Sequence, residues 1–196
     1  MKILLHTCCG PCLGGSIQTF INENHQITAF WENPNIHGFF EFRNRFESFC
    51  KIVKQLGIPT ILGSQEFLPE LFFKTLEGKK PSERCFHCFK LRLSSTAKVA
   101  AQMGFDSFCT TLLISPYQKR EYLLKAGREA AEEFNISFFE TDLRNQFPRT
   151  HQAIRDYELY KQKYCGCIFS EKERFSGMEK FNFDFAKDLK KQHSQN

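Results

Sequence analysis

Seven of the nine cysteines in this chain of 196 residues fall into three short segments that lie far apart in the sequence. The seven are Cys8, Cys9 and Cys12, then Cys85 and Cys88, and finally Cys165 and Cys167. Thiolates can bind one metal ion or one iron–sulfur cluster only where the fold brings them together. The spacing therefore favours folds in which the three segments meet, and it indicates chemistry more than packing.

Length and composition fit one domain with a hydrophobic core, because 41% of the residues are hydrophobic. No stretch has the pattern of a membrane span or of a secretory signal, so we expect a cytoplasmic protein. We also expect it to be a monomer. In the reducing cytoplasm, clustered cysteines bind metals or carry out redox chemistry more often than they form static disulfides. The odd number of cysteines agrees with that expectation.

Strands and helices alternate along the chain. The hydrophobic pattern predicts strands over 2–7, 26–31, 59–62, 106–113 and 136–139, and helices that start near residue 17 and cover 39–56, 86–103 and 118–134. Such alternation is typical of an α/β fold: a single Rossmann-like (HUP/PP-loop-like) domain with a parallel sheet flanked by helices. We expect an α/β core over 1–148 and a helical C-terminal cap over 149–196 that carries Cys165 and Cys167, with a frayed end over 187–196.

Ligands of such folds bind beyond the carboxyl ends of the strands. The segment with Cys8, Cys9 and Cys12 follows the first predicted strand, residues 33–37 follow the second, and residues 110–117 follow the fourth. The carboxyl edge of the sheet is therefore the predicted site.

The cysteine pairs allow several kinds of centre. Cys85-x-x-Cys88 fits half of a zinc site, a thioredoxin-like pair or half of a cluster site. Adjacent Cys8 and Cys9 are unusual for zinc but can reach different irons, so these two pairs would satisfy one 4Fe-4S cluster. Cys165-Gly-Cys167 can form a strained, easily reduced disulfide, or its sulfurs can join Cys12 in holding an additional single iron near the cluster. Cys50 and Cys109 lie in apolar stretches and are expected to be structural.

Two basic segments surround the second and third cysteine groups. Residues 74–98 hold seven basic and two acidic side chains, and residues 144–174 hold seven and four. Positive charge lowers the pKa of nearby thiols and attracts polyanions such as RNA. His37 and Asp106 are further candidates for a proton donor, although a loop histidine and a turn aspartate would explain them equally well.

Five segments together resemble the QueH family of epoxyqueuosine reductases. They are His6-Thr-Cys-Cys-Gly-Pro-Cys12, Asn33-Pro-Asn-Ile-His37, Cys85-Phe-His-Cys-Phe-Lys-Leu-Arg92, Thr110-Thr-Leu-Leu-Ile-Ser-Pro-Tyr-Gln118 and Tyr164-Cys-Gly-Cys-Ile-Phe-Ser-Glu171. The resemblance runs from Leu4 to about Arg174, with the motifs in the order of the family. Small departures occur at Gly10, Gly38 and Phe89, none of which is a cluster ligand.

The resemblance implies a cobalamin-independent enzyme that removes the epoxide oxygen of epoxyqueuosine at the wobble position of tRNA, the last step of queuosine synthesis. It implies a 4Fe-4S cluster on Cys8, Cys9, Cys85 and Cys88, with Cys165 and Cys167 as a redox-active pair or as ligands of an adjacent iron. The anticodon arm of the tRNA would be the partner, and the electron donor is not indicated. We take as substrate-binding candidates Asn33, Asn35, Arg84, Arg92 and Tyr117.

Two other functions fit the residues. Gly14-Gly15-Ser16 could serve as a phosphate loop in an ATP-dependent tRNA sulfur-transfer enzyme on the same scaffold, although such a short motif is weak evidence. The cysteines could instead bind zinc in a non-catalytic RNA-binding module, which metal analysis would distinguish from an iron–sulfur protein.

Overall fold

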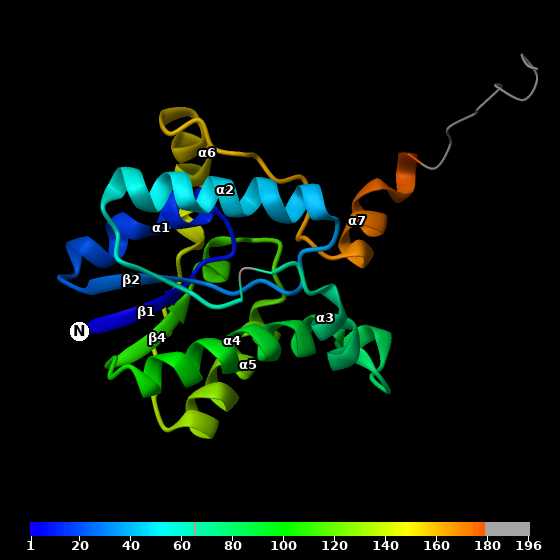
Figure 1. Ribbon diagram of the computed structural model, residues 1–196, viewed down its shortest axis with the longest axis horizontal. Coiled ribbons are helices and arrows are strands. Elements are labelled where there is room, and N and C mark those ends of the chain that lie inside the picture. The colour runs from blue at the N-terminus through cyan, green and yellow to red at the C-terminus, as the bar shows by residue number, and fades with distance from the viewer. Residues whose placement is uncertain (65, 179–196) are drawn as a thin grey trace, which may run out of the picture.

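A sheet of five parallel strands runs through the centre of the computed structural model, which describes residues 1–64 and 66–178 (Figure 1). The strands are β1 (Lys2–His6), β2 (Gln26–Trp31), β3 (Thr60–Leu62), β4 (Ser107–Thr110) and β5 (Ser137–Phe138), in the order β3-β2-β1-β4-β5. Strand β1 lies in the middle, where Ile3 pairs with Ile27 of β2 and with Ser107 of β4. The predicted parallel α/β fold is confirmed.

Helices cover both faces of the sheet. Along the chain they are α1 (Gly10–Asn22), α2 (Phe39–Leu56), α3 (Pro69–Leu76), α4 (Arg84–Gln102), α5 (Arg120–Phe134), α6 (Phe147–Asp156) and α7 (Ile168–Phe175). Helices α1, α2 and α6 lie on one side, and α4 and α5 pack together on the other (Figure 1). Short 3-10 turns lie between these elements or after the last of them, at residues 81–83, 111–114, 144–146 and 176–178.

Burial on both faces explains the composition of the central strands. Ile3, Leu4 and Leu5 of β1 are fully buried although their side chains alternate between the two faces. A strand covered by helices on both sides loses water from every side chain, and this favours a continuous apolar run. Helix α2 ends before Gly57, as the sequence predicts.

Four local features differ from the sequence predictions. Helix α1 starts at Gly10 instead of near residue 17, because the Cys9 sulfur caps it by accepting from the Cys12 amide at 3.4 Å and Pro11 fits its first turn. Strand β4 ends at Thr110 instead of continuing to Leu113, because the Thr110 hydroxyl accepts a hydrogen bond from the Leu112 amide at 3.2 Å and starts a 3-10 turn. Helix α4 starts at Arg84, so Cys85 and Cys88 lie in its first turn. Helix α3 was not predicted, since its eight residues give too short a periodic pattern.

The segment after residue 146 begins with α6, which packs closely on α1. A Cβ atom placed on Gly14 of α1 would lie 2.6 Å from the Cβ of Ala153 in α6 and 2.7 Å from Cδ1 of Ile52 in α2. The absence of a side chain at Gly14 therefore allows three helices to approach one another. The division into a core over 1–148 and an extension over 149–196 stays a prediction, and its end, including the expected frayed residues 187–196, lies outside the described residues.

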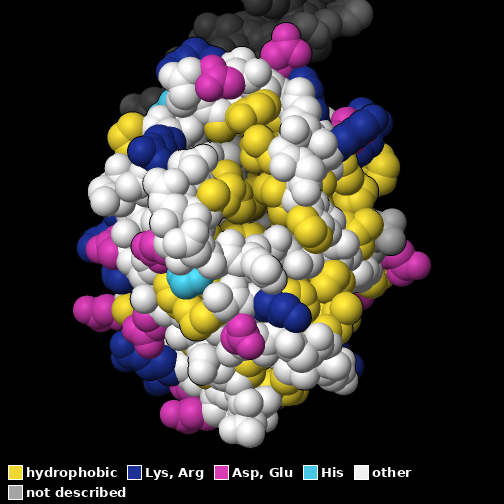
Figure 2. Space-filling view, turned by 90° about the vertical axis from the view of Figure 1, so that its left-hand side faces the viewer, with side chains coloured by type: hydrophobic (Ala, Val, Ile, Leu, Met, Phe, Trp, Pro, Cys, Tyr) yellow, Lys and Arg dark blue, Asp and Glu magenta, His cyan; other side chains and the backbone are white. Residues whose placement is uncertain are grey.

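The face at the amino ends of the strands carries charges of both signs. Figure 2 shows Lys, Arg, Asp and Glu side chains spread around its rim, with hydrophobic side chains over its middle. No helix in the described ranges 1–64 and 66–178 is long and apolar enough to span a membrane. A mixed surface of this kind has no strong field of one sign to attract a polyanion.

We predict that Gly14→Val lowers the free energy of unfolding by about 2 to 3 kcal/mol, because the new side chain would force α1 away from α2 and α6. Gln18→Val on the exposed side of the same helix is the matched control and should change stability by less than about 0.5 kcal/mol. Urea unfolding followed by circular dichroism measures both. Equal effects of the two variants would contradict the close approach.

Candidate metal and redox site

A cavity of about 900 Å³ opens at the carboxyl ends of the strands. Six cysteines from all three predicted groups line it: Cys8, Cys12, Cys85, Cys88, Cys165 and Cys167. Cys9 is buried directly beside Cys8, whereas Cys50 on α2 and Cys109 in β4 do not line the cavity. All nine cysteines have free thiols in the structure, so Cys165 and Cys167 are not joined in a disulfide.

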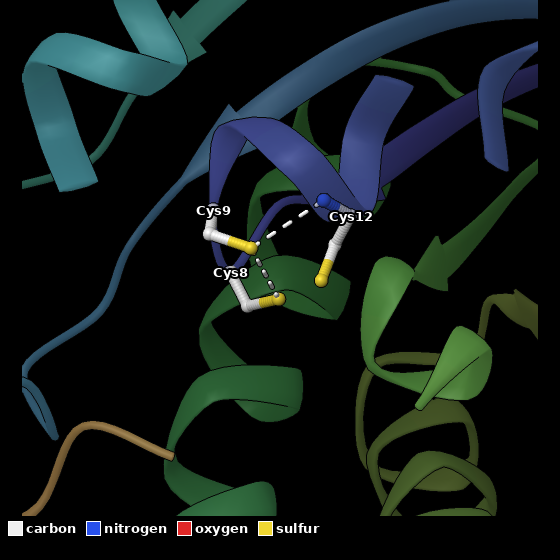
Figure 3. A group of neighbouring side chains, drawn as sticks. All are labelled: Cys8, Cys9 and Cys12. Carbon is white, nitrogen blue, oxygen red and sulfur yellow. Dashed lines mark hydrogen bonds between the residues drawn. The ribbon is translucent and has the colours of Figure 1, made fainter. Parts of the chain in front are cut away.

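The first cysteine group lies where β1 passes into α1 (Figure 3). The sulfur atoms of Cys8 and Cys9 are 3.7 Å apart, and the three Sγ atoms of Cys8, Cys9 and Cys12 all lie within 4.8 Å of one another. Two thiolates on one tetrahedral metal ion are separated by about 3.8 Å, the edge of a tetrahedron with bonds of about 2.3 Å. The three sulfurs are thus spaced like ligands of a common metal.

Hydrogen bonds determine which of these thiols ionises most easily. Hydrogen bonds with the Cys12 and Cys9 thiols lower the pKa of Cys8 well below its usual range, and the Thr111 hydroxyl donates to Cys8 Sγ at 3.4 Å. The pKa values of Cys9 and Cys12 are raised, mainly by burial for Cys9 and by the hydrogen bond to Cys8 for Cys12. The group therefore favours one shared thiolate, and a metal would have to displace the other protons.

The second group lies in the first turn of α4. Cys85 and Cys88 are three residues apart, so their side chains share one face of the helix. Burial raises the pKa of the Cys88 thiol to about 12 and also raises that of Cys85. Cys88 packs with Cys167 and Phe72 in a small buried cluster. Buried thiols of this kind gain most from a metal, which supplies the positive charge that they lack.

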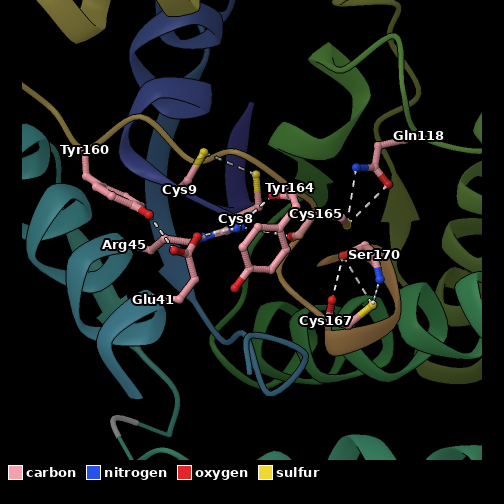
Figure 4. Close-up of polar contacts among 10 residues, drawn as sticks. All are labelled: Cys8, Cys9, Glu41, Arg45, Gln118, Tyr160, Tyr164, Cys165, Cys167 and Ser170. Atoms are coloured by element: carbon pink, nitrogen blue, oxygen red, sulfur yellow. Dashed lines mark hydrogen bonds and ion pairs between the residues drawn. The ribbon is translucent and has the colours of Figure 1, made fainter. Parts of the chain in front are cut away.

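The third group, Cys165-Gly166-Cys167, is held from α2 by a buried arginine (Figure 4). Arg45 donates from Nη1 to the Cys165 carbonyl at 2.9 Å and from Nη2 to the Tyr164 carbonyl at 2.8 Å. Its Nε donates to Oε1 of Glu41 at 2.7 Å, and the other oxygen of Glu41 accepts from the Tyr160 hydroxyl at 2.5 Å. This ion pair fixes the loop that carries both thiols.

His37 holds the same loop from the other side. Its amide donates to the Gly166 carbonyl at 2.8 Å, and its Nδ1 accepts from the Ile168 amide at 3.0 Å. Burial lowers the pKa of His37 to about 4, and the ring lies against Phe72 and Phe73. Gly166 has φ +130°, which only glycine adopts without strain. The neutral ring of His37 is therefore a structural partner of the loop and does not line the cavity.

Asp106 lies at the opposite end of the sheet from the cavity. It precedes β4, and its carboxylate accepts from the Lys2 amide at 2.6 Å at the start of β1. The sequence hypothesis that Asp106 faces the site as a proton donor does not agree with this position, because the residue marks the amino edge of the sheet. Its carboxylate instead satisfies the first backbone amide of β1.

The proposed substrate-binding residues divide into buried and accessible ones. Asn35, Arg84 and Tyr117 line the cavity, and Tyr117 is 82% exposed. Asn33 and Arg92 are buried beneath it, where the Arg92 Nη2 donates to the Asn33 Oδ1 at 2.7 Å. A small ligand in the cavity would contact the first set and not the second.

Sequence analysis missed Arg45 and Gln118. Gln118 lines the cavity and places its Nε2 3.6 Å from the Cys165 sulfur. Arg45 shares the buried face of α2 with Phe42 and Phe49, so a charged residue on an apolar helical face was the available signal. Its partner Glu41 is also largely buried, with a side chain that is 10% exposed.

The supposed phosphate loop lies inside a helix. Gly14, Gly15 and Ser16 belong to α1, and the Ser16 hydroxyl donates to the Cys12 carbonyl at 2.9 Å. Backbone amides in a helix interior are already engaged in the helix and cannot surround a phosphate. This geometry removes the residue evidence for an ATP-dependent sulfur-transfer enzyme.

The strand order and the helices on both faces define a Rossmann-like (HUP/PP-loop-like) α/β fold, with the thiol-lined cavity at the carboxyl ends of its strands. In solved structures the fold resembles the U34-tRNA thiolase NcsA from Methanococcus maripaludis, with a TM-score of 0.55 and 12% identity over 95% of this chain and 67% of that one. It also resembles a predicted subunit of tRNA methyltransferase from Methanocaldococcus jannaschii, with a TM-score of 0.51 and 14% identity over 78% and 75%. At these identities the likeness concerns the fold alone.

Sequence comparison identifies the family. The family model described as epoxyqueuosine reductase QueH matches residues 3–173. The chain is 34% identical over 174 residues to the epoxyqueuosine reductase QueH of Dehalococcoides mccartyi, covering 89% of this chain and 94% of that protein. It is 35% identical over 204 residues to the Helicobacter pylori protein of the same name, covering 97% of this chain but 55% of that protein. The chain belongs to the QueH family.

We predict that Glu41→Gln lowers the free energy of unfolding by about 3 to 5 kcal/mol, because it leaves the buried Arg45 guanidinium without its carboxylate. The matched control is Glu47→Gln on the same helix, which breaks the exposed pair with Arg43 at the same spacing of four residues. Its effect should be below about 1 kcal/mol. Thermal and urea unfolding of both variants provide the measurement, and similar losses would contradict the role assigned to Glu41.

Proposed function

We propose that this protein is a cobalamin-independent epoxyqueuosine reductase that uses a 4Fe-4S cluster and acts on the wobble nucleoside of tRNA. Membership of the QueH family over residues 3–173 is the observation that carries the proposal. A cavity lined by six cysteines gives the fold a place for redox chemistry. We place the reaction in the cytoplasm, where the reducing thiol pool keeps free thiols such as these nine available.

The reaction removes one oxygen from the substrate. Epoxyqueuosine takes up two electrons and two protons, both C–O bonds of the epoxide break, and an alkene and one water molecule form. An alkoxide is a poor leaving group, so acid or Lewis-acid assistance at the oxygen lowers the barrier. The protein must therefore deliver electrons and also stabilise the departing oxygen.

The donor set fits a cluster. Cys8 and Cys85 with Cys88 reach one cavity, Cys9 lies beside Cys8, and all four are sulfur ligands of the kind that iron–sulfur clusters require. These four residues would hold the cluster, which when bound supplies electrons one at a time. The raised pKa values of Cys9, Cys85 and Cys88 mean that these thiols lose their protons when the metal binds.

The remaining thiols are the chain's own groups near the reacting centre. Arg45 and His37 hold the Cys165-Gly166-Cys167 loop so that both thiols border the cavity with Cys12. We assign Cys165 and Cys167 to a redox-active pair or, with Cys12, to the ligands of an adjacent iron. Gln118, which contacts the Cys165 sulfur, is placed to orient either the thiol or the substrate.

The charge of the cavity supports an RNA substrate. Six of its lining residues are Lys or Arg and one is Glu: Arg45, Arg84, Lys119, Lys161, Lys163 and Arg174, against Glu173. Tyr117 is exposed at the same cavity, and its ring packs edge-on against Phe147 at 5.8 Å between centroids. Arg45 is buried and paired with Glu41, so we propose that the other basic side chains contact phosphates of the anticodon arm and that Tyr117 stacks on the extruded base.

We predict that Cys85→Ala abolishes both the bound iron and sulfide and the turnover of epoxyqueuosine-containing tRNA, because one of four thiolates is lost. Cys50→Ala, which removes a thiol outside the cavity, should retain both. Anaerobic purification, iron and sulfide quantitation, visible absorption and an assay with a chemical reductant make the comparison. Zinc without iron and sulfide in the unmodified protein would favour the zinc-binding module instead.

We predict that Lys163→Ala weakens tRNA binding and lowers the slope of log affinity against log salt by about 1, because one phosphate contact is lost. Lys98→Ala, an exposed lysine that does not line the cavity, is the control of equal charge change. Binding is measured by fluorescence anisotropy at several salt concentrations. The same slope change in both variants would argue against phosphate contacts at the cavity.

A further inference from the structure

Arg92 is a buried cation beneath the cysteine-lined cavity. It lies one turn after Cys88 on α4 and is 1% exposed. Its Nη2 donates to Asn33 Oδ1 at 2.7 Å, and its Nε donates to His6 Nε2 at 3.3 Å. Its Nη1 is buried and has no hydrogen-bond partner among residues 1–64 and 66–178.

Among residues 1–64 and 66–178 the guanidinium also has no acidic partner. Within the part of the chain that the structure describes, none of the ion pairs includes Arg92. The other fully buried arginine, Arg45, is paired with Glu41 at 2.6 Å. An isolated buried charge is costly, so its survival in the core indicates that another negative group compensates it.

The groups that can compensate Arg92 are those bound by the cysteines beside it. Cys88 lies one turn before Arg92 on α4. On the other side, the Arg92 Nε donates to His6, two residues before Cys8, and Asn33, which accepts from Arg92 Nη2, donates to the Thr7 carbonyl at 2.9 Å. His6 accepts its bond from Arg92 and supplies no negative charge. The cation is therefore placed between the first and the second cysteine segments.

We infer that Arg92 is the fixed counter-charge of the thiolate-bound centre, and that it raises the reduction potential of that centre instead of binding substrate. The inference rests on the proposed function, since the centre is the iron–sulfur cluster proposed above. Reduction adds one negative charge to an already anionic group, and a buried cation stabilises the reduced state more than the oxidised one. Arg92 does not line the cavity, so it is not placed to meet the tRNA.

The substitutions separate charge from shape. Arg92→Gln removes the charge, and Arg92→Lys retains it with a different shape. Asn33→Asp leaves Arg92 in place but puts a carboxylate at the oxygen that already accepts its hydrogen bond. Arg128→Gln removes an exposed arginine on α5 and serves as the control for a general loss of charge.

The measurement is the midpoint potential of the cluster in the full-length protein, from an anaerobic redox titration followed by electron paramagnetic resonance, together with iron and sulfide content. In Arg92→Gln and Asn33→Asp the ratio of reduced to oxidised cluster at a fixed potential should fall at least tenfold, about 59 mV for one electron. Arg92→Lys and Arg128→Gln should stay within about threefold of the unmodified protein, which is less than 30 mV for one electron.

Unchanged potentials in cluster-containing Arg92→Gln and Asn33→Asp would overturn the inference while leaving the proposed function intact. If Arg92→Gln holds no cluster, the midpoint potential of cluster-containing Asn33→Asp tests the inference in its place. Loss of the cluster from both, with retention in Arg92→Lys, supports the counter-charge, whereas equal loss from Arg92→Lys shows a packing role and refutes it. Absence of iron and sulfide from the unmodified protein would overturn the proposed function, and the inference with it.

Discussion

The parallel pairing of β1 with β2 on one side and with β4 on the other determines where the reactive segments lie. Parallel strands end at the same edge of a sheet, so the residues that follow β1, β2 and β4 are neighbours in space. Cys8 after β1 and Thr111 after β4 illustrate this, because the Cys8 amide donates to the Thr111 hydroxyl at 3.1 Å across 103 positions of sequence. The cysteine-lined cavity lies at this edge, and the strand pairing therefore determines its position.

Two buried arginines serve the cavity in different ways. Arg45 is paired with Glu41, and its other N–H groups donate hydrogen bonds to backbone carbonyls of the third cysteine loop. Arg92 has neutral partners, Asn33 and His6, and keeps its charge available to the thiols. One arginine therefore fixes geometry and the other sets the electrostatic potential, a division that follows from whether a carboxylate is adjacent.

Much of the fold was predictable from the sequence because the periodic signals are strong. The fully apolar run in β1 and the long amphipathic pattern of α2 are both typical of their elements. The end of β4 was not predictable, since the apolar run continues through Leu113 with β-branched Thr111 in it, and the hydrogen bond of the Thr110 hydroxyl ends the strand. Short elements such as α3 fall below the length at which periodicity is informative.

The cavity was predictable only in part. The cysteine motifs are visible in the sequence, and the strand order places the group after β1 at the carboxyl edge of the sheet. The positions of the other two groups, on α4 and between α6 and α7, do not follow from the strand order. The roles of His37 and Asp106 depend instead on which backbone groups face them, and the sequence does not record this. His37 turned out to hold the loop at residues 165–167, and Asp106 to bind the first residues of β1. Long-range hydrogen bonds of this kind have no sequence period.

The clamp between Arg45 and the carbonyl of Cys165 joins positions 120 residues apart. During translation the first two cysteine groups are synthesised well before the third. Arg45 is also synthesised long before the two carbonyls that it binds. The contacts of Arg45 with the loop at residues 165–167 can therefore form only after that loop has been synthesised, and any centre that uses Cys165 or Cys167 has to be completed after that point.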